Sequence, residues 1–159
     1  MTRDDLKSLP PEIILALCIW AEARGEGERG MTAVAWVIRN RVEADLGNDG
    51  KPDWWGEGYA GVILAPWQFS SFNANDPNLP KLIALAQGGD APMWGSAKRV
   101  ARDVIAGRCQ DPTRGSTHYF NARVCGLPAW SKKMLLVAVV GNHRFYREGK
   151  ESKGGEVAA

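Results

Sequence analysis

Apolar residues recur at three- and four-residue steps over most of the first two thirds of the chain, and this spacing predicts helices. The first predicted helix begins at Pro10 or Pro11, because proline suits a first helical turn, and it runs to about Arg24. A second helix is expected from Met31, after a polar connection rich in Gly and Glu over residues 25–30. Further helices are expected at residues 58–65, 81–87 and 94–106.

The last third of the chain changes from a helical to a strand pattern. Residues 116–121 are rich in aromatic and β-branched side chains, which favours a short strand. Residues 135–140 and 143–147 are separated by Gly141-Asn142, a two-residue hairpin signal. These patterns together predict an α+β fold, mainly helical, with a small antiparallel sheet near the end.

Several segments are expected to lack regular structure because they are polar or interrupted by Gly and Pro. They are an irregular N-terminal segment over residues 1–9, a surface loop over residues 45–61 around Trp54-Trp55, and a loop marked by Asn75, Asp76, Pro77 and Pro80. We expect a single domain over residues 1–147, followed by a flexible tail over residues 148–159.

Composition indicates an ordinary globular chain. Of its 159 residues 45% are hydrophobic and 24% are charged, which is enough apolar material for one substantial core. The net charge of +2 gives no reason to expect a nucleic-acid partner. Seven tryptophans are many for this length, and exposed aromatic faces often serve as platforms for sugar rings. We expect a monomer.

The N-terminal region and the cysteines indicate the cellular compartment in which the protein is made. No apolar stretch near the N-terminus is long enough for a signal peptide or a membrane span, so we expect synthesis in the cytoplasm and no stable membrane association. Cys18 lies in an apolar helix stripe and is expected to be a buried free thiol. Cys109 and Cys125 could either form a disulfide or stay free.

Glu22 stands out by its position. It continues the apolar stripe formed by Ile14, Leu17 and Cys18 by one helical turn, just before Gly25, a residue suited to end the helix in a left-handed conformation. Burial and the negative end of the helix dipole should both raise its pKa, and a protonated carboxyl near neutral pH can act as a general acid. The plainer alternative is a solvated Glu at the helix edge.

Other catalytic chemistries lack the residues that they need. With only His118 and His143, no His-x-x-x-His and no Cys-x-x-Cys, the chain offers no zinc site, and we expect neither a metal nor a cofactor. A nucleophilic Cys125 near His118 is a weak option. Acid catalysis of glycoside cleavage fits best. No second carboxylate is favoured by its position among Glu26, Glu28, Asp53, Glu57 and Asp76.

Several short blocks in order give the chain a resemblance to a known family. They begin with Ala21-Glu22-Ala23-Arg24-Gly25-Glu26, Gly30 and Asn40-Arg41-Val42, and continue with residues 69–73 and 117–121, Pro128, Trp130 and the closing Gly141-Asn142-His143-Arg144-Phe145-Tyr146. Over residues 13–146 the chain resembles the spore-cortex-lytic type of bacterial cell-wall hydrolase.

The resemblance implies a lysozyme-like domain that acts on peptidoglycan. It implies a lytic transglycosylase that cleaves the bond between N-acetylmuramic acid and N-acetylglucosamine, with Glu22 as general acid and base and a 1,6-anhydro sugar as product. One catalytic carboxylate suffices for that reaction. A hydrolytic muramidase and an amidase are the near alternatives, and a non-catalytic wall-binding module is the alternative that is not an enzyme.

The glycan strand is expected to be held by polar side chains from several segments. The candidates are Glu26, Asn40, Gln68, Ser70, Ser71, Asn73, Thr117, Tyr119 and Asn121. Glu26 could instead be structural, Asn40 and Arg41 could bind the loop that carries Glu26, and the polar groups of residues 68–73 could satisfy loop backbone.

Strand alternation separates the candidates near the C-terminus into two faces. Thr117, Tyr119 and Asn121 share one face, and we expect that face, not the one with His118 and Phe120, to line the cleft. The block of residues 143–146, with His143, Phe145 and Tyr146, is expected to pack within the hairpin.

The missing export signal separates this chain from spore enzymes and suggests a phage endolysin, which would reach the cell wall through a holin-made lesion. A bacterial protein with unconventional export is the other possibility.

Overall fold

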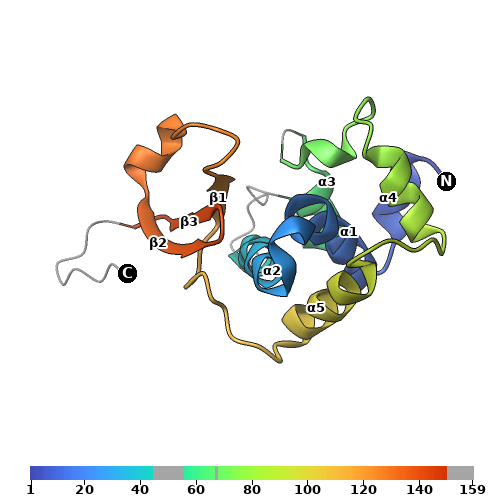
Figure 1. Cartoon of the computed structure of the whole chain (residues 1–159), viewed down its shortest axis with the longest axis horizontal. Helices are drawn as coiled ribbons and strands as arrows, with labels where there is room; N and C mark the ends of the chain where they lie inside the picture. Colours follow the sequence, from blue (N-terminus) through green and yellow to red (C-terminus); the bar gives the residue numbers. More distant parts are fainter. Residues whose placement is uncertain (45–55, 67, 150–159) are drawn as a thin grey trace.

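Helix α1 (Pro11–Ala23) lies at the centre of the structure, a computed structural model that describes residues 1–44, 56–66 and 68–149. Pro11 occupies its first turn, as the sequence predicts. The predicted stripe of Ile14, Leu17 and Cys18 is fully buried, but residues 15, 16, 19 and 20 are buried as well. The helix is buried on all sides because α2, α3, α4 and α5 all contact it (Figure 1).

The connection after α1 is shorter than the sequence suggests. The chain forms one 3-10 turn, Arg24–Glu26, and α2 (Gly27–Ala44) follows at once. The expected left-handed helix end at Gly25 is wrong, since Gly27 has the positive φ of 73°. The start of the second helix at Met31 is also wrong, by one turn. Gly30 is a close-packing position, because an added Cβ would lie 2.6 Å from the Cβ of Glu26.

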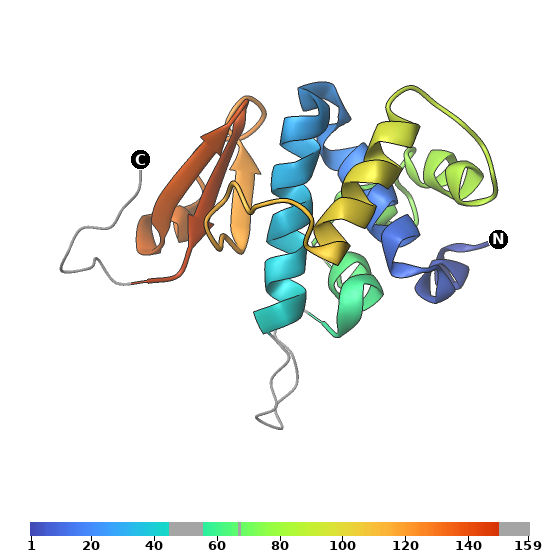
Figure 2. The same ribbon diagram turned by 90° about the horizontal axis from the view of Figure 1, so that it is seen from below.

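Helix α2 separates the other helices from the sheet (Figure 2). The apolar stripe predicted for it is confirmed, with Met31, Val34, Ala35 and Ile38 buried and Val42 partly buried. Ala33, Val37 and the guanidinium-bearing Arg41 are buried in addition. This wide buried surface follows from contacts with α1, α3 and α5 on one side and with β2 on the other.

The remaining helices surround α1. Helix α3 spans Gly58–Leu64, close to the prediction, and α5 spans Trp94–Ala106 as predicted, with Gly107 left-handed at φ 72°. Helix α4 (Leu79–Ala86) begins two residues earlier than expected. Pro80 lies within its first turn, where its missing N–H costs no hydrogen bond, so its assignment to a loop is wrong.

The expectation of an irregular N-terminal segment is wrong. Residues Arg3–Ser8 form a 3-10 helix whose Leu6 is fully buried. Arg3 ties this segment to the helical lobe, since its Nε and Nη2 donate to the carbonyls of Phe72 (2.6 Å) and Leu64 (3.0 Å). Asp5 caps the segment by accepting from the main-chain N–H of Thr2 at 2.6 Å.

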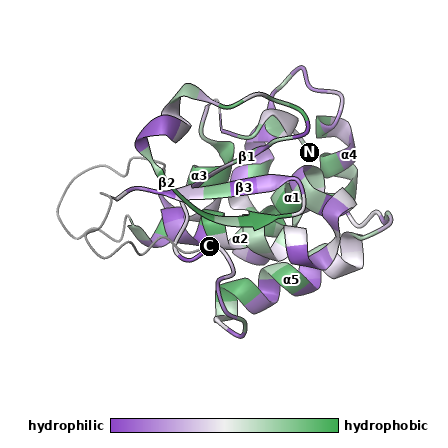
Figure 3. Ribbon diagram, turned by 60° about the vertical axis from the view of Figure 1, so that its left-hand side comes forward, coloured by the Kyte–Doolittle hydropathy of each residue, from purple (hydrophilic) through white to green (hydrophobic). Residues whose placement is uncertain are grey.

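A three-stranded antiparallel sheet forms the second lobe. Strands β1 (His118–Asn121), β2 (Leu135–Val140) and β3 (His143–Arg147) match the predicted segments, and β3 is the central strand. Tyr119 lies opposite Phe145 on the face toward the helices, whereas Phe120, Tyr146 and Trp130 pack on the other face. Figure 3 shows β2 hydrophobic along its length, although Leu136 and Val139 are exposed at this edge of the sheet.

The observed arrangement is therefore the predicted α+β one. Among the described residues, no helix is long and apolar enough to span a membrane. The predicted loop around Trp54-Trp55 and the tail beyond residue 149 lie outside the residues that the structure describes.

Candidate active site

A pocket of about 350 Å³ lies where the helical lobe meets the sheet. Residues from α1, α2, the segment after α3, β1 and β3 line it. Its polar lining consists of Glu22, Arg41, Gln68, Tyr119, Asn121 and His143. Among the described residues, Glu22 is the only carboxylate in this lining.

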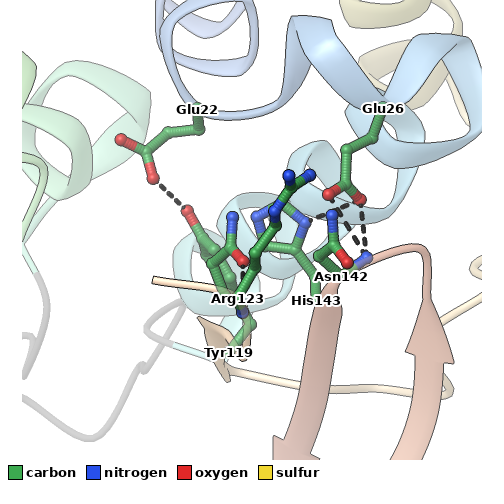
Figure 4. Close-up of polar contacts among 7 residues, drawn as sticks. Glu22, Glu26, Tyr119, Arg123, Asn142 and His143 are labelled. Atoms are coloured by element: carbon green, nitrogen blue, oxygen red, sulfur yellow. Dashed lines mark hydrogen bonds and ion pairs between the residues drawn. The ribbon is translucent and has the colours of Figure 1, made fainter. Parts of the chain in front are cut away.

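Glu22 is placed by the last turn of α1 and held by the sheet. The hydroxyl of Tyr119 donates to Glu22 Oε1 at 2.6 Å, as Figure 4 shows. The Tyr119 ring is itself fixed by stacking on Phe145, with ring centroids 5.6 Å apart, and by an edge contact with His143 at 5.2 Å. Within the described chain Glu22 Oε2 has no hydrogen-bond partner, so this oxygen is free to hold a proton for a ligand.

The environment raises the pKa values of both partners. Burial raises the pKa of Glu22 above its usual value, and this effect exceeds the lowering by the Tyr119 hydrogen bond and by the positive field of His143. Burial, with the neighbouring Glu22, raises the pKa of Tyr119 well above its usual value. Tyr119 therefore remains a donor, and Glu22 is a carboxyl that can give up a proton and take one back.

Arg41 joins three segments at the pocket wall. Its Nε donates to the carbonyl of Thr117 at 2.7 Å, and its Nη1 donates to Gln68 Oε1 at 3.0 Å. Burial lowers the pKa of this guanidinium, but an arginine stays charged at any physiological pH. The side chain thus fixes the segment after α3 and the start of β1 against α2.

Glu26 lies one turn beyond Glu22 and binds the β2–β3 turn. Its carboxylate accepts from the main-chain N–H of Asn142, at 3.1 Å from Oε1 and 3.2 Å from Oε2, and Oε1 lies 3.1 Å from His143 Nδ1 (Figure 4). Only 14% of the Glu26 side chain and 3% of the His143 side chain are exposed. Glu26 is therefore tied to the hairpin, which agrees with its structural alternative.

The structure brings together four of the ten predicted site residues: Glu22, Gln68, Tyr119 and Asn121 line the pocket. The other six do not line it, namely Glu26, Asn40, Ser70, Ser71, Asn73 and Thr117. Of the predicted strand face, Tyr119 and Asn121 line the pocket and Thr117 does not, and Phe120 of the opposite face lines it as well. Thr117 precedes β1, and its hydroxyl lies 3.0 Å from His118 Nδ1.

Two of the four amides predicted to bind sugar, Asn40 and Asn73, lie outside the pocket. Asn40 Nδ2 donates to Asp111 Oδ2 at 3.0 Å and to the carbonyl of Ser116 at 2.9 Å, so it fixes the segment before β1 and not the loop that carries Glu26. Asn73 borders a different hollow, beside Arg3 and Leu64. Ser70 is exposed and Ser71 is buried in the short 3-10 turn Ser70–Phe72.

Arg41 and His143 line the pocket although the sequence analysis gave them no binding role. Arg41 does not belong to the apolar stripe predicted for α2, so the sequence pattern does not indicate its burial, which the structure shows. The sequence analysis predicts packing for His143, because strand alternation alone does not show which face of the strand meets the helices. Of the four described tryptophans, Trp20, Trp36, Trp94 and Trp130, none lines this pocket.

The alternative chemistries find little support in the described residues. All three thiols are free, and Cys18 is buried as predicted. Cys125 is exposed at the pocket, whereas His118 lines a separate hollow beside Trp130. No group of three or more His, Cys, Asp or Glu that could hold a metal occurs within the described ranges.

A mainly helical lobe, a small antiparallel sheet and a half-buried carboxyl between them define the lysozyme-like class. The family described as Cell Wall Hydrolase matches residues 25–146, a range that includes Glu26 and starts three residues after Glu22. The chain therefore belongs to the cell wall hydrolase family, and the predicted relation to enzymes of the spore-cortex-lytic type is confirmed.

Individual relatives agree with this assignment. The spore cortex-lytic enzyme of Halalkalibacterium halodurans is 30% identical over 132 residues, which are 83% of this chain and 33% of the relative, so the chain spans about a third of that protein. The catalytic domain of the germination-specific lytic transglycosylase SleB from Bacillus anthracis is 26% identical, with a TM-score of 0.58 over 88% of this chain and 98% of that one. The Bacillus cereus SleB catalytic domain is 27% identical, with the same TM-score over 86% and 90%. The predicted fold class is confirmed.

Proposed function

We propose that this chain degrades peptidoglycan as a lytic transglycosylase that cleaves the bond between N-acetylmuramic acid and N-acetylglucosamine. The single observation that carries the proposal is the Glu22 carboxyl, which lies in the pocket with a raised pKa and a hydrogen bond from Tyr119. The relatives support the same reaction class, since one is a spore cortex-lytic enzyme and one is a lytic transglycosylase.

In the first step, Glu22 acts as general acid. Its proton moves to the glycosidic oxygen while the bond from that oxygen to the anomeric carbon of the muramic acid breaks. The carboxylate that results is stabilised by the hydrogen bond from Tyr119 at Oε1 and by the positive field of His143. The leaving sugar departs with a free hydroxyl group.

In the second step, the same carboxylate acts as a base. It takes the proton of the muramic acid 6-hydroxyl as that oxygen bonds to the anomeric carbon, so that the 1,6-anhydro ring closes and Glu22 is protonated again. Water is not consumed. The opposing effects on the Glu22 pKa suit this cycle. Burial favours the protonated carboxyl that acts as the acid, and the Tyr119 hydrogen bond favours the carboxylate that acts as the base.

The number of carboxylates in the pocket favours this reaction over the two-carboxylate route. Most hydrolytic glycosidases use a pair of carboxyl groups about 5 to 9.5 Å apart. Among the carboxylates of the described residues only Glu22 lines the pocket, and Glu26 binds Asn142 and His143 instead. A mechanism with one carboxylate therefore fits these residues best.

The test is a digest of purified peptidoglycan followed by mass spectrometry of the released fragments. Lytic transglycosylase action yields 1,6-anhydro-muramic acid ends. Reducing muramic acid ends would instead show a hydrolytic muramidase, and free stem peptides would show an amidase. Binding to the wall without any soluble fragment would contradict the assignment and favour a wall-binding module.

The same chemistry would serve a phage endolysin, and we propose host lysis as the biological role. A cell that makes the protein in its cytoplasm should then stay intact until the membrane is permeabilised, and lyse promptly afterwards. Continued turbidity after permeabilisation would contradict this role. The Glu22→Gln variant is the control.

A further inference from the structure

The pairing of Glu26 with His143 is more elaborate than the attachment of a hairpin requires. Glu26 already binds the β2–β3 turn through the main-chain N–H of Asn142. The turn approaches so closely that a Cβ at Gly141 would overlap Glu26 Oε1, and Gly141 has a φ of 58°. The buried imidazole of His143 is a second contact to the same carboxylate. Burying a polar ring has a desolvation cost, which attachment of the turn through the main chain alone would avoid.

The pairing fixes one nitrogen of the imidazole ring. An ionised carboxylate is an acceptor only, so His143 Nδ1 carries a hydrogen and donates to Glu26 Oε1. The ring is confined further by the edge of Tyr119 at 5.2 Å and by Phe145, whose centroid is 6.1 Å away. Orientation and the role of Nδ1 are therefore set by the protein.

The second nitrogen is left for a ligand. His143 lines the same pocket as Glu22 and Tyr119, and no hydrogen bond to Nε2 is found among the residues that the structure describes. In Figure 4 the ring lies between Glu26 and the pair formed by Glu22 and Tyr119. A carboxylate that orients an imidazole toward a reaction site is an arrangement that catalytic sites use repeatedly.

From this geometry we propose that His143 is a further catalytic residue, whose Nε2 binds a hydroxyl group of the sugar at the cleavage point while Glu26 holds the ring. A sugar hydroxyl both donates and accepts, so it suits the ring in either protonation state. The proposal rests on the proposed function, because it places the glycan beside Glu22. Glu26 is a positioning residue in this scheme and does not touch the substrate.

The most direct test is ¹⁵N NMR of the imidazole rings in the full chain. The chain has two histidines, and His118 lines a separate hollow, so it serves as an internal control. Soluble glycan strands are added to the Glu22→Gln variant, which should bind without turnover. We expect the Nε2 signal of His143 to shift with saturation while His118 stays constant. Glycan binding without a shift of His143 would overturn the proposal.

Two substitutions test the catalytic consequence. Asn at position 143 retains a donor near the place of Nδ1, whereas Gln retains a polar group near the place of Nε2. We expect His143→Asn to unfold close to the wild-type temperature and to lose about tenfold or more in kcat/KM on soluble glycan strands. His143→Gln should keep more activity and less stability. The reverse order of activities would overturn the proposal.

The outcomes separate this inference from the proposed function. If the wild type releases anhydro-muropeptides and His143→Asn is as active as the wild type, only the role of His143 is wrong. If the wild type releases none, the proposed function itself fails.

Discussion

The Tyr119 hydroxyl lies 2.6 Å from Glu22 Oε1 and joins two residues that are 97 positions apart in the sequence. Glu22 lies in the last turn of the central helix α1, and Tyr119 belongs to strand β1, so this hydrogen bond connects the two lobes across the pocket. It favours the ionised carboxyl, whereas burial favours the protonated one. The balance between the two effects sets the acid strength of Glu22.

Removal of the Tyr119 hydroxyl should make Glu22 a weaker acid. Tyr119→Phe keeps the ring that stacks on Phe145 and removes the hydrogen bond that lowers the Glu22 pKa. The pKa of Glu22 should rise, so the limb of the pH–rate profile at which activity falls with increasing pH should move upward. The measurement is kcat/KM on soluble glycan strands as a function of pH.

Tyr146→Phe is the matched control, because Tyr146 packs against Phe120 and Trp130 on the other face of the sheet. Its profile should coincide with that of the wild type. If the high-pH limb of the Tyr119→Phe profile does not move, or moves to lower pH, the assigned role of the hydrogen bond is contradicted.

Glu22 should reduce stability at neutral pH. Its pKa is higher in the folded than in the unfolded chain, so folding is favoured by protonation below the unfolded pKa and this contribution is lost as the pH rises through the folded pKa. Glu22→Gln cannot ionise and should melt about a few degrees above the wild type at pH 7. The difference should shrink toward pH 4.

Thermal denaturation at several pH values measures this effect. Glu12→Gln, at the start of the same helix, is the control and should show no comparable gain. A wild type that is more stable than Glu22→Gln at pH 7 would show that burial does not dominate the Glu22 environment.

Gly141 should be intolerant of even one added carbon. Its φ is 58°, and a Cβ there would overlap the Glu26 carboxylate. Gly58 has a similar φ of 68° with no atom within 4 Å of an added Cβ, so Gly58→Ala measures the backbone cost alone, on the order of 1 to 2 kcal/mol. Gly141→Ala should lower the free energy of unfolding by clearly more than this.

Urea denaturation of both variants gives the comparison. Adding Glu26→Ala to Gly141→Ala should recover part of the excess, because the overlapping carboxylate is then removed. Equal losses for the two single glycine variants would mean that the turn does not press against Glu26.

Local sequence signals were sufficient for most of the fold. The bounds of α5 and both strands of the hairpin follow from periodicity and from Gly107 and Gly141-Asn142, all of which act within a few residues. The errors occur where distant contacts decide. Burial orders Leu6, and hydrogen bonds to carbonyls more than 60 residues away order Arg3. The N-terminal segment is therefore structured despite its polar composition.

In the site, too, local patterns are readable from the sequence and distant contacts are not. One helix stripe places Glu22 beside the core, whereas strand alternation groups Tyr119 with Asn121 without showing which face of the strand meets the helices. The contact of Asn40 with Asp111 and the pairing of Glu26 with His143 both join segments more than 70 residues apart, and nothing in either segment alone indicates its partner. A polar residue whose partner lies so far along the chain looks like a binding residue when only the sequence is read.

The central claim is that Glu22 performs the acid step of an anhydro-forming cleavage. Wild type, Glu22→Gln and the Glu12→Gln control are incubated with purified peptidoglycan, and the soluble fragments are analysed by mass spectrometry. The account predicts 1,6-anhydro-muramic acid ends from the wild type and the control, and none above background from a folded Glu22→Gln. Anhydro ends released by Glu22→Gln at the wild-type rate would contradict it.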